Sequence, residues 1–285
     1  IRKQGWKAYA ICSQNRILTV CTEEPARLLG LAVDIGSTKI ACYLMDLTSG
    51  NTLAAKGVPN PQIAYGEDII ARLSYAMQGA EQEERLHSDL IRAINQAAEE
   101  LVKTTGAQAE EIADFCMVGN TAMHHFFLHL PTRQLATSPF TPAIKKETLI
   151  SAETIGVKGL PGSRILVPGP IAGFVGSDHL AFLLASGFGD DGAVRLGIDI
   201  GTNTEIPLQK GKRIISCSTA SGPAFEGAHI RFGMRASRGA IEHVAIDQNG
   251  KARCKVIGDG EATGICGSGI LDAISEMKKS GILNQ

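Results

Sequence analysis

The order of apolar and polar positions in the first half of the chain predicts strands followed by helices. Apolar runs at residues 31–35 and 40–45 are typical of neighbouring strands, and a third strand is expected near residues 52–55. A helical stretch is expected from residue 67, because its second part repeats apolar residues at spacings of three and four. These residues are Leu86, Leu90, Ile94, Ala97 and Leu101.

The alternation of strands and helices continues beyond this helix. Residues 115–118 are expected to form a buried strand, and residues 122–130 a short helix whose N-cap is Asn120 or Thr121. Six of the 11 prolines lie between residues 131 and 170, which predicts a long connection with little regular structure. The remaining elements predicted for this half are a strand at 164–167 and a helix at 177–186.

The second half of the chain repeats the same order of elements. Three strands are expected near residues 195, 205 and 213, followed by a hairpin with its turn at 247–250 and a helix at 268–279. Pro207 in the second of these strands predicts an edge strand or a bulge. The chain ends before further pairs of strand and helix, so the second repeat is expected to be incomplete at its C-terminus. The predicted organisation is a linker at 1–30, a first lobe at 31–190 and a second lobe at 191–285.

Each half opens on an apolar strand that ends in Asp-Ile-Gly and continues into hydroxyl residues. The first copy is Asp34-Ile35-Gly36-Ser37-Thr38-Lys39, and the second is Asp199-Ile200-Gly201-Thr202-Asn203-Thr204. A second strand follows each copy, whereas a Walker loop or a dinucleotide fingerprint needs a helix directly after its glycines. One such turn alone would be explained by a simple hairpin. Two matched copies in like contexts favour a functional role.

These residue types suit a site for a magnesium-bound nucleotide. Glycine lets the backbone approach a polyanion closely, while successive N–H groups and hydroxyl groups donate to phosphate oxygens. An aspartate at the strand end would repel phosphate unless a cation lay between them, and Mg²⁺ binds through one or two carboxylates, water and substrate phosphates. Two such turns facing each other would clamp Mg-ATP, with Asp34 and Asp199 as the residues that hold the metal.

Composition narrows the classes of partner that the chain is expected to bind and the cell compartment in which it is expected to work. The 285 residues are 44% hydrophobic and 20% charged with a net charge of −1, so we expect no binding of nucleic acid or an anionic membrane. Asp178 and His179 interrupt the most apolar stretch, residues 171–188, so a membrane span is not expected. Seven scattered cysteines without a Cys-x-x-Cys pair favour the cytoplasm. Because the chain begins at Ile1 without a signal peptide, it is expected to be a piece of something longer.

Further candidates lie outside the two turns. Glu205 is expected to support the Mg²⁺ site, and Glu226 would position water for hydrolysis unless it is only an exposed loop carboxylate. Gly267-Ser268-Gly269 precedes a helix and would receive nucleotide at the helix N-terminus, unless its serine is a plain N-cap. His125 and His129 have a spacing that can bind zinc, but no third ligand accompanies them, so packing is the favoured role.

The duplicated strands and helices, with a phosphate turn at the start of each copy, resemble the actin, sugar-kinase and Hsp70 superfamily of ATPases (ASKHA), a duplicated RNase H-like α/β fold. From about Leu31 to the end, a narrower set of motifs resembles the reductive activators of corrinoid-dependent methyltransferases and O-demethylases. These motifs lie at residues 31–36, 60–62, 65–68, 118–125, 198–203, 221–227 and 264–269.

The resemblance implies that ATP binding and hydrolysis drive reduction of an inactive Co(II) corrinoid on a partner protein to methyl-accepting Co(I). The electron would come from a [2Fe-2S] ferredoxin-like domain at the N-terminus, whose Cys-x4-Cys-x2-Cys spacing is absent here. The family also continues past Gln285 to a turn that helps to hold adenosine, and it usually has glycine where Thr204 stands. The resemblance further implies that Asn120 and His124 couple the phosphate cleft to a moving helix.

Two other functions stay open. A 2-hydroxyacyl-CoA dehydratase-type activator shares the ATPase fold but carries a [4Fe-4S] cluster between subunits, and a small-molecule kinase belongs to the same superfamily. The sequence is compatible with a homodimer. The residues expected at the site are Asp199, Glu205 and Glu226 for catalysis, Asp34 and Asp199 for the metal, and Asp34, Gly36, Ser37, Thr38, Lys39, Asn120, Asp199, Gly201, Thr202, Asn203, Thr204, Gly222, Gly267, Ser268 and Gly269 for the nucleotide.

Overall fold

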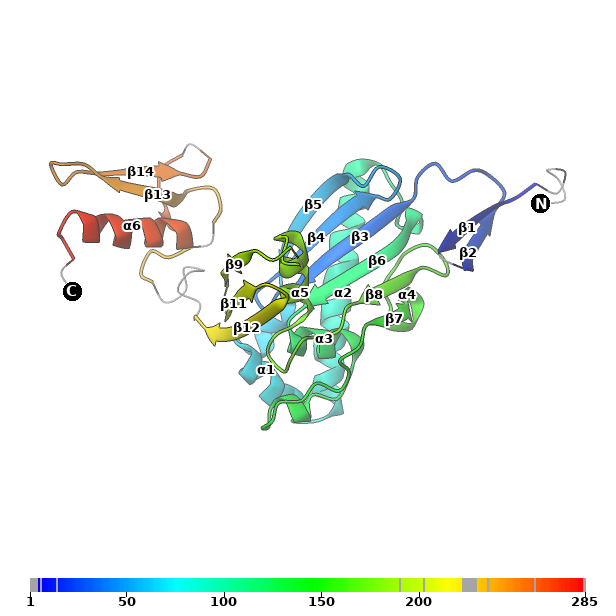
Figure 1. The fold of residues 1–285 in the computed structure, drawn as a ribbon. Helices are drawn as coiled ribbons and strands as arrows, with labels where there is room; N and C mark the ends of the chain where they lie inside the picture. The colour runs from blue at the N-terminus through cyan, green and yellow to red at the C-terminus, as the bar shows by residue number, and fades with distance from the viewer. Residues whose placement is uncertain are drawn as a thin grey trace. The chain divides into compact units, whose positions relative to one another are not determined.

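The chain folds into two compact units, Ile1–Gly189 and Asp190–Gln285. The computed structural model drawn in Figure 1 describes residues 5, 7–13, 15–189, 191–201, 203–221, 230–234, 236–258 and 260–283. Both units combine strands with helical structure, and the elements include short ones that the hydrophobic pattern does not predict.

The first unit is built on a six-stranded sheet (Figure 1). Its strands are β3 (Leu29–Ile35), β4 (Lys39–Asp46), β5 (Thr52–Pro59), β6 (Ile112–Gly119), β7 (Thr148–Ser151) and β8 (Arg164–Val167). They lie in the order β5-β4-β3-β6-β8-β7. The first three pair antiparallel, whereas β6 runs parallel to both β3 and β8. The carboxyl ends of β3 and β6 therefore meet at one edge of the sheet, where Ile35 lies beside Gly119.

Helices of the first unit bury their apolar faces against this sheet. They are α1 (Ile69–Ala76), α2 (Ala80–Thr105), α3 (Thr121–Leu128), α4 (Ala152–Ile155) and α5 (Ser177–Ala185), with short 3₁₀ turns η2 (Pro61–Tyr65), η3 (Ala109–Glu111) and η4 (Arg133–Leu135). Helix α2 confirms the predicted apolar face, because Leu86, Leu90 and Ile94 are fully buried. The helix ends where Gly106 adopts a left-handed φ of 66°.

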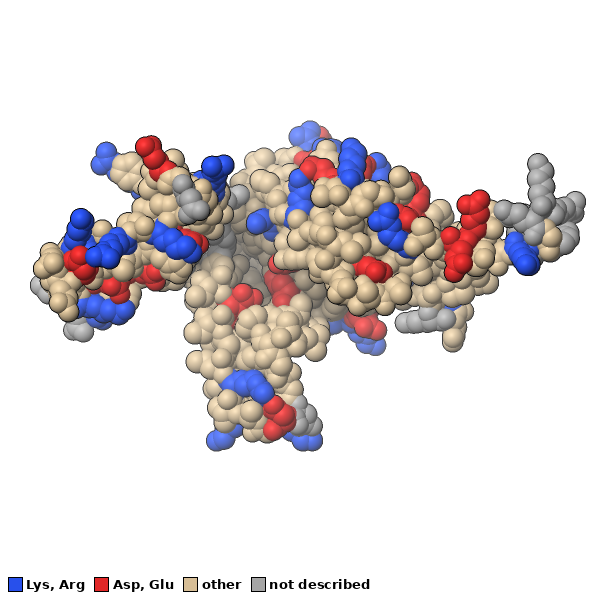
Figure 2. Space-filling model, turned by 90° about the horizontal axis from the view of Figure 1, so that it is seen from above, with Lys and Arg blue, Asp and Glu red and all other residues tan. Residues whose placement is uncertain are grey.

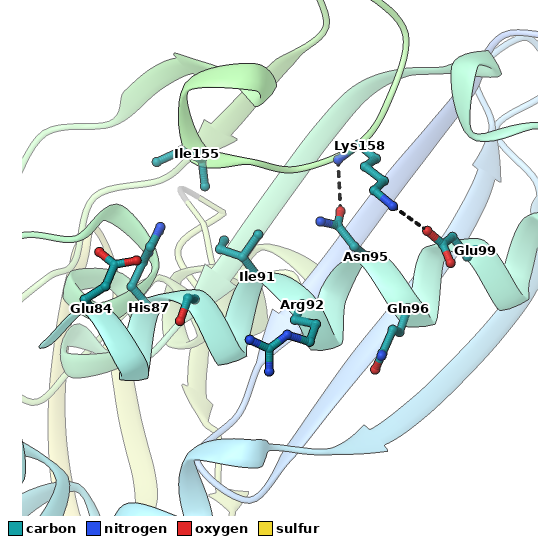
Figure 3. Close-up of a pocket in the computed structure, with 10 residues that line it drawn as sticks. Glu84, His87, Ile91, Arg92, Asn95, Gln96, Glu99, Ile155 and Lys158 are labelled. Atoms are coloured by element: carbon teal, nitrogen blue, oxygen red, sulfur yellow. Dashed lines mark hydrogen bonds and ion pairs between the residues drawn. The ribbon is translucent and has the colours of Figure 1, made fainter. Parts of the chain in front are cut away.

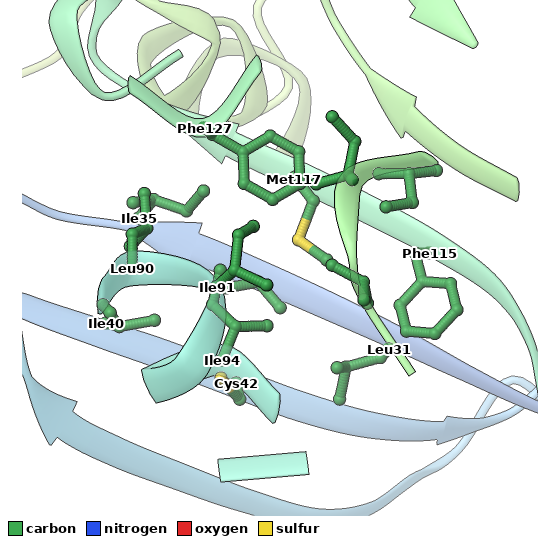
Figure 4. Close-up of a cluster of buried hydrophobic side chains, with 14 of the residues drawn as sticks. Leu31, Ile35, Ile40, Cys42, Leu90, Ile91, Ile94, Phe115, Met117 and Phe127 are labelled. Carbon is green, nitrogen blue, oxygen red and sulfur yellow. The ribbon is translucent and has the colours of Figure 1, made fainter. Parts of the chain in front are cut away.

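The core of the first unit lies between α2 and the sheet (Figure 4). Along β4, buried Ile40 and Cys42 alternate with exposed Lys39 and Tyr43, as expected for a strand with one face in the core. Each large apolar side chain that is fully buried contributes roughly 1.5–3 kcal/mol to folding. The same burial raises the pKa of Cys42 to about 12, so this thiol stays protonated.

Residues 1–30, expected as a linker, contain a structured hairpin of β1 (Tyr9–Ser13) and β2 (Arg16–Cys21). Only the second of these strands has a visible apolar run in the sequence. Ile11 is buried, and Arg27 donates hydrogen bonds to the carbonyl oxygens of Thr105 and Gly106, at 3.2 and 2.9 Å. Because those carbonyls end α2, the arginine caps the helix and complements its dipole.

The proline-rich connection at 131–170 has more regular structure than predicted. It contributes the edge strand β7, which pairs antiparallel with β8, and the single turn of α4. The alternation in this short strand is too weak to see in the sequence, and its pairing with β8 supplies the stability that its own pattern lacks.

Among its described residues, the second unit contains two small sheets and one helix. Its elements are β9 (Val194–Leu196), β10 (Asp199–Ile200), β11 (Asn203–Lys210), β12 (Arg213–Ala220), β13 (Ala240–Ile246), β14 (Ala252–Val256), β15 (Gly264–Ile265) and α6 (Gly267–Lys279). Strands β9 to β12 form one sheet and β13 to β15 the other. The three predicted strands and the hairpin turning at 247–250 are confirmed, although the first strand is divided into β9 and β10.

Pro207 corrects one expectation about the second unit. A proline lacks the N–H that a sheet ladder needs, which predicts an edge strand or a bulge. Strand β11 instead lies inside its sheet, between β12 on one side and β9 and β10 on the other. The gap between β9 and β10 faces the proline, whose carbonyl oxygen accepts a hydrogen bond from Gly197 at 2.9 Å. The neighbouring strand is thus interrupted where the proline offers no donor.

Helix α6 packs against the β13 to β15 sheet through its acidic side chains as well as its apolar ones. Asp272 and Glu276 accept hydrogen bonds from the backbone N–H groups of Val244 and Ile246, at 3.4 and 3.2 Å. The helix begins at Gly267 with Cys266 as its N-cap, so the alternative of Ser268 as N-cap is wrong.

Figure 2 shows basic and acidic side chains interspersed on the face that it draws, so neither sign of charge dominates there.

Candidate functional site

The first Asp-Ile-Gly turn joins β3 to β4 in a tight hairpin. A Cβ atom at Gly36 would lie 2.5 Å from the carbonyl oxygen of Lys39, so the turn has no room for a larger residue. Asp34 is exposed near the end of β3, level with Ala41 on one side and Val118 on the other. A carboxylate and a bare glycine backbone therefore lie side by side at the carboxyl edge of the sheet, where α/β sheets bind ligands.

Asn120 ties the start of α3 to this turn. Its Oδ1 accepts hydrogen bonds from the N–H groups of Ala122 and Met123, at 3.1 and 3.0 Å, so it is the N-cap, one of the two residues predicted. Its Nδ2 donates to Ser37 Oγ at 2.9 Å. One side chain thus fixes both the helix N-terminus and a hydroxyl of the turn, and the structure brings these two predicted site residues together.

Asn60 holds the turn from the other side and is absent from the predicted site. Its Nδ2 donates to the carbonyl oxygen of Gly36 at 2.9 Å, and its N–H donates to that of Thr38, also at 2.9 Å. The side chain is buried. A polar residue just after a strand, in the Asn-Pro-Gln motif, is the signal that would have indicated it.

A third segment, the start of α5, also reaches this edge. Ser177 Oγ lies 3.2 Å from both the nitrogen and the oxygen of Gly119, the last residue of β6. At Gly176, an added Cβ would lie 2.2 Å from that same oxygen, so the two backbones touch directly. The ends of β3 and β6 and the start of α5 therefore form one polar corner, of which Ser177 was not predicted.

The side chain of Lys39, which is also a predicted site residue, lies against β5. Its side chain fills the space where a side chain at Gly57 of β5 would stand, with Cε 2.0 Å from that Cβ position. The ammonium group thus lies on the β5 side of the hairpin.

The second turn brings two carboxylates together. Asp199 of β10 is the cross-strand partner of Glu205 of β11, and Glu205 Oε1 accepts a hydrogen bond from Ser218 Oγ at 2.9 Å. Burial raises the pKa of Glu205, the neighbouring Asp199 charge raises it further, and the hydrogen bond from Ser218 opposes both. A cation beside this pair would favour both charges, so these residues fit a divalent metal.

The structure describes some of the remaining predicted residues of the second unit and not others. Asn203 and Thr204 follow the turn in β11, and Thr204 Oγ1 hydrogen bonds with Ser221 Oγ. Gly201 links β10 to β11. Gly269 packs on the carbonyl of Ile241 at the start of α6, where Ser268 is exposed. Thr202, Gly222 and Glu226 lie outside the described residues.

The histidines of α3 serve the backbone. His125 Nδ1 donates to the carbonyl oxygen of Thr121 at 2.7 Å, and its Nε2 accepts from the N–H of Ala143 at 2.9 Å. Both ring nitrogens are used, so a metal would have to displace one. The next histidine, His124, is buried, and burial lowers its pKa to about 4, with His125 adding to the shift. Within the described part of the chain, no three His, Cys, Asp or Glu residues group as metal ligands.

His125→Ala is expected to lower the free energy of unfolding by about 1–3 kcal/mol, because it removes a buried ring and its hydrogen bonds to the Thr121 carbonyl and the Ala143 N–H. Metal content should not change. Chemical denaturation and metal analysis of the purified protein measure both effects. His129→Asn is the control, since that side chain is 45% exposed and asparagine tolerates the left-handed backbone of this helix C-cap. Stoichiometric zinc in the wild type, lost in His125→Ala, would contradict the structural role.

A groove of about 500 Å³ runs along the outer face of α2, away from the predicted site residues (Figure 3). Asn95 spans it with hydrogen bonds to the carbonyl of Gly156 and the N–H of Lys158, at 2.8 and 2.9 Å. Lys158 also pairs with Glu99 at 2.8 Å. These pairs tie the loop after α4 to the helix, so the groove's polar groups already serve the fold.

None of the described helices is long and apolar enough to cross a bilayer.

Comparisons with known proteins agree over almost the whole chain. The RACo middle region matches residues 29–191, and the C-terminal domain of RACo, the ASKHA domain, matches residues 193–285. The corrinoid activation enzyme RamQ of Eubacterium limosum is 35% identical over 286 residues, which cover 97% of this chain and 46% of that protein. The Co(II) methylated amine-specific corrinoid protein reductase of Methanosarcina barkeri is 26% identical, covering 90% of this chain and 52% of that protein.

One solved structure, a reductive activator for corrinoid, iron-sulfur protein, superposes with a TM-score of 0.87 and 35% sequence identity. The match covers 94% of this chain and 43% of that one. The chain thus spans about half the length of the relatives that it matches. The ASKHA-type α/β fold expected from the duplicated motif is confirmed. The chain belongs to the RACo family and carries that family's middle region followed by its C-terminal ASKHA domain.

Proposed function

We propose that this chain is the nucleotide-binding part of an ATP-dependent reductive activator, which returns the Co(II) form of a corrinoid protein to Co(I) in methyl transfer or O-demethylation. One observation carries the proposal. Two Asp-Ile-Gly turns, each leading from strand to strand with a carboxylate beside a glycine, occur in a chain of the RACo family. The names of its relatives supply the corrinoid partner.

In this proposal the first turn binds a phosphate of ATP. The bare backbone at Gly36 admits a close approach, and the hydroxyl groups of Ser37 and Thr38 serve as donors. Asn120 orients Ser37 through its 2.9 Å hydrogen bond. Asp34 holds Mg²⁺ through water, because a carboxylate beside phosphate requires a cation between them.

In the second unit, the second turn is proposed to hold Mg²⁺ through carboxylates of its own. Asp199 and Glu205 face each other across β10 and β11, and burial together with the Asp199 charge raises the pKa of Glu205, so a cation there would favour its charged form. Mg²⁺ would neutralise phosphate charge there and polarise the terminal phosphoryl group. Glu226 is proposed to position the attacking water. Gly201, Thr202, Asn203 and Thr204 are proposed to hold phosphate, and Gly222, Gly267, Ser268 and Gly269 to complete the nucleotide site.

ATP is needed because the electron transfer is uphill. Each 59 mV of unfavourable one-electron transfer costs about 1.4 kcal/mol. Nucleotide offsets such a cost only if it binds one of two conformations more tightly, and the partner distinguishes the same two. We propose that the clamped and open forms of the two turns are those conformations. The electron donor is proposed to be a [2Fe-2S] domain of the whole protein. The protein is proposed to work in the cytoplasm, and a homodimer is a compatible assembly.

The test is reduction of the corrinoid partner by the full-length protein under anaerobic conditions, with and without Mg-ATP. We expect the Co(II) absorption spectrum to convert to that of Co(I) only with Mg-ATP. Reduction at the same rate without nucleotide would exclude this function. In that case, iron analysis would test for the [4Fe-4S] cluster of a dehydratase-type activator, and ATP consumption against small acceptors would test for a kinase.

A further inference from the structure

A guanidinium group lies fully buried behind the first turn. Arg72 of α1 is 0% exposed, and its Nε donates to the carbonyl oxygen of Gly66 at 2.8 Å. Within the described part of the chain, no carboxylate forms an ion pair with Arg72 and its Nη2 has no hydrogen-bond partner. Burial lowers the pKa of Arg72 to about 10, while Asp68 opposes this effect, so the group is charged at neutral pH.

Direct contacts connect this cation to the turn. Arg72 Nη1 lies 4.0 Å from the sulfur atom of Met123, which also lies 3.5 Å from Asn60 Nδ2. That amide nitrogen donates to the carbonyl oxygen of Gly36. Met123 belongs to the first turn of α3, whose cap, Asn120, binds Ser37. Two buried side chains therefore separate the guanidinium from the backbone expected to receive phosphate.

A buried cation without a counter-ion is costly, and an anion that arrives nearby reduces that cost. Solvent screens this interaction little, because the groups between the cation and Gly36 are buried. At a separation on the order of 10 Å and an effective dielectric constant of about 20, the attraction corresponds to roughly a tenfold change in affinity. The guanidinium donates to the Gly66 carbonyl oxygen and, weakly, to the Met123 sulfur, so most of its five donors are unused and Nη2 has no partner.

We propose that Arg72 is a positioning residue whose buried charge raises the affinity of the first turn for phosphate-bearing ligands without touching them. This inference rests on the proposed function, because it takes the Gly36 turn to be a phosphate site. Phosphate bound at this turn would then add to the attraction that the Asp68 charge already exerts on the guanidinium.

The test compares Arg72→Met, which removes the charge, with Arg72→Lys, which keeps it, in the full-length protein. Calorimetry measures the affinity of each for Mg-ATP, Mg-pyrophosphate and adenosine. We expect Arg72→Met to bind ATP and pyrophosphate about tenfold more weakly and adenosine unchanged, and Arg72→Lys to bind all three like the wild type. If Arg72→Met does not fold, Arg72→Gln replaces it, because glutamine keeps a donor for the Gly66 carbonyl.

Two results would overturn the inference while leaving the proposed function intact. One is wild-type affinity for ATP and pyrophosphate in the neutral variants. The other is an equal loss in Arg72→Met and Arg72→Lys, which would show that hydrogen-bond geometry, and not charge, is what matters. A wild-type protein that binds neither phosphate ligand would overturn the proposed function and this inference together.

Discussion

Asp199→Asn in the full-length protein is expected to leave the fold intact and to abolish ATP turnover. Asparagine has nearly the same shape as aspartate but no charge with which to hold Mg²⁺. Asp199 lies opposite Glu205, whose pKa its charge helps to raise, so the substitution removes a repulsion and should not lower the free energy of unfolding. We expect turnover to fall about 10²–10³-fold, the usual loss when one preorganised electrostatic group is removed.

Phosphate release measures turnover, and thermal unfolding monitors the fold. Glu261→Gln is the matched control, since this carboxylate of the same unit is exposed and should tolerate the loss of its charge. Turnover at the wild-type rate in Asp199→Asn would exclude the metal-binding role of the second turn, whatever the effect on stability.

The chain as it stands is expected not to reduce a corrinoid protein, even with Mg-ATP. Reduction to Co(I) needs a one-electron donor of low potential, whereas thiols and disulfides exchange two electrons. The seven cysteines lack the Cys-x4-Cys-x2-Cys spacing of a [2Fe-2S] site, and among the described residues no three His, Cys, Asp or Glu side chains group as metal ligands. Joining a [2Fe-2S] domain ahead of Ile1 and the family's further residues after Gln285 should produce ATP-dependent reduction, visible in the corrinoid absorption spectrum.

The same joined protein carrying Asp199→Asn is the control and should remain inactive, since its clamp would no longer respond to nucleotide. Corrinoid reduction by the chain alone would show that the electron need not come from a [2Fe-2S] domain. Equal reduction by the joined protein without ATP would remove the reason for two nucleotide turns, and the activator function would have to be abandoned for one of its rivals.

The parts of the fold that the sequence predicts are those whose pattern is local. The apolar face of α2, the hairpin around Gly36 and the N-cap at Asn120 all follow from spacing or from one side chain and its neighbours. Strand β7 is too short for its alternation to stand out, and its pairing with β8 stabilises it.

The candidate site divides in the same way. Both turns can be recognised from a repeated motif, but Asn60 reaches the first turn, and Arg72 and Ser177 reach the residues Met123 and Gly119 near it, from segments distant in sequence. No spacing rule connects an asparagine after β5 with a glycine that precedes it by 24 positions. The Pro207 expectation failed because a break in the neighbouring strand, which only the three-dimensional pairing shows, removes the need for a donor there.

The contact of Gly176 with Gly119 has a mechanical consequence. In most of the core, side chains separate the backbones and can change rotamer to absorb a displacement. Here an added Cβ would lie 2.2 Å from the Gly119 oxygen and 2.3 Å from the Asn120 Cα, so no such cushion exists. A ligand that shifts the Asn120 peptide by a fraction of an ångström must therefore push the start of α5 by a similar amount. Within the first lobe, a displacement of the backbone at Asn120 is therefore expected to displace the start of α5 as well.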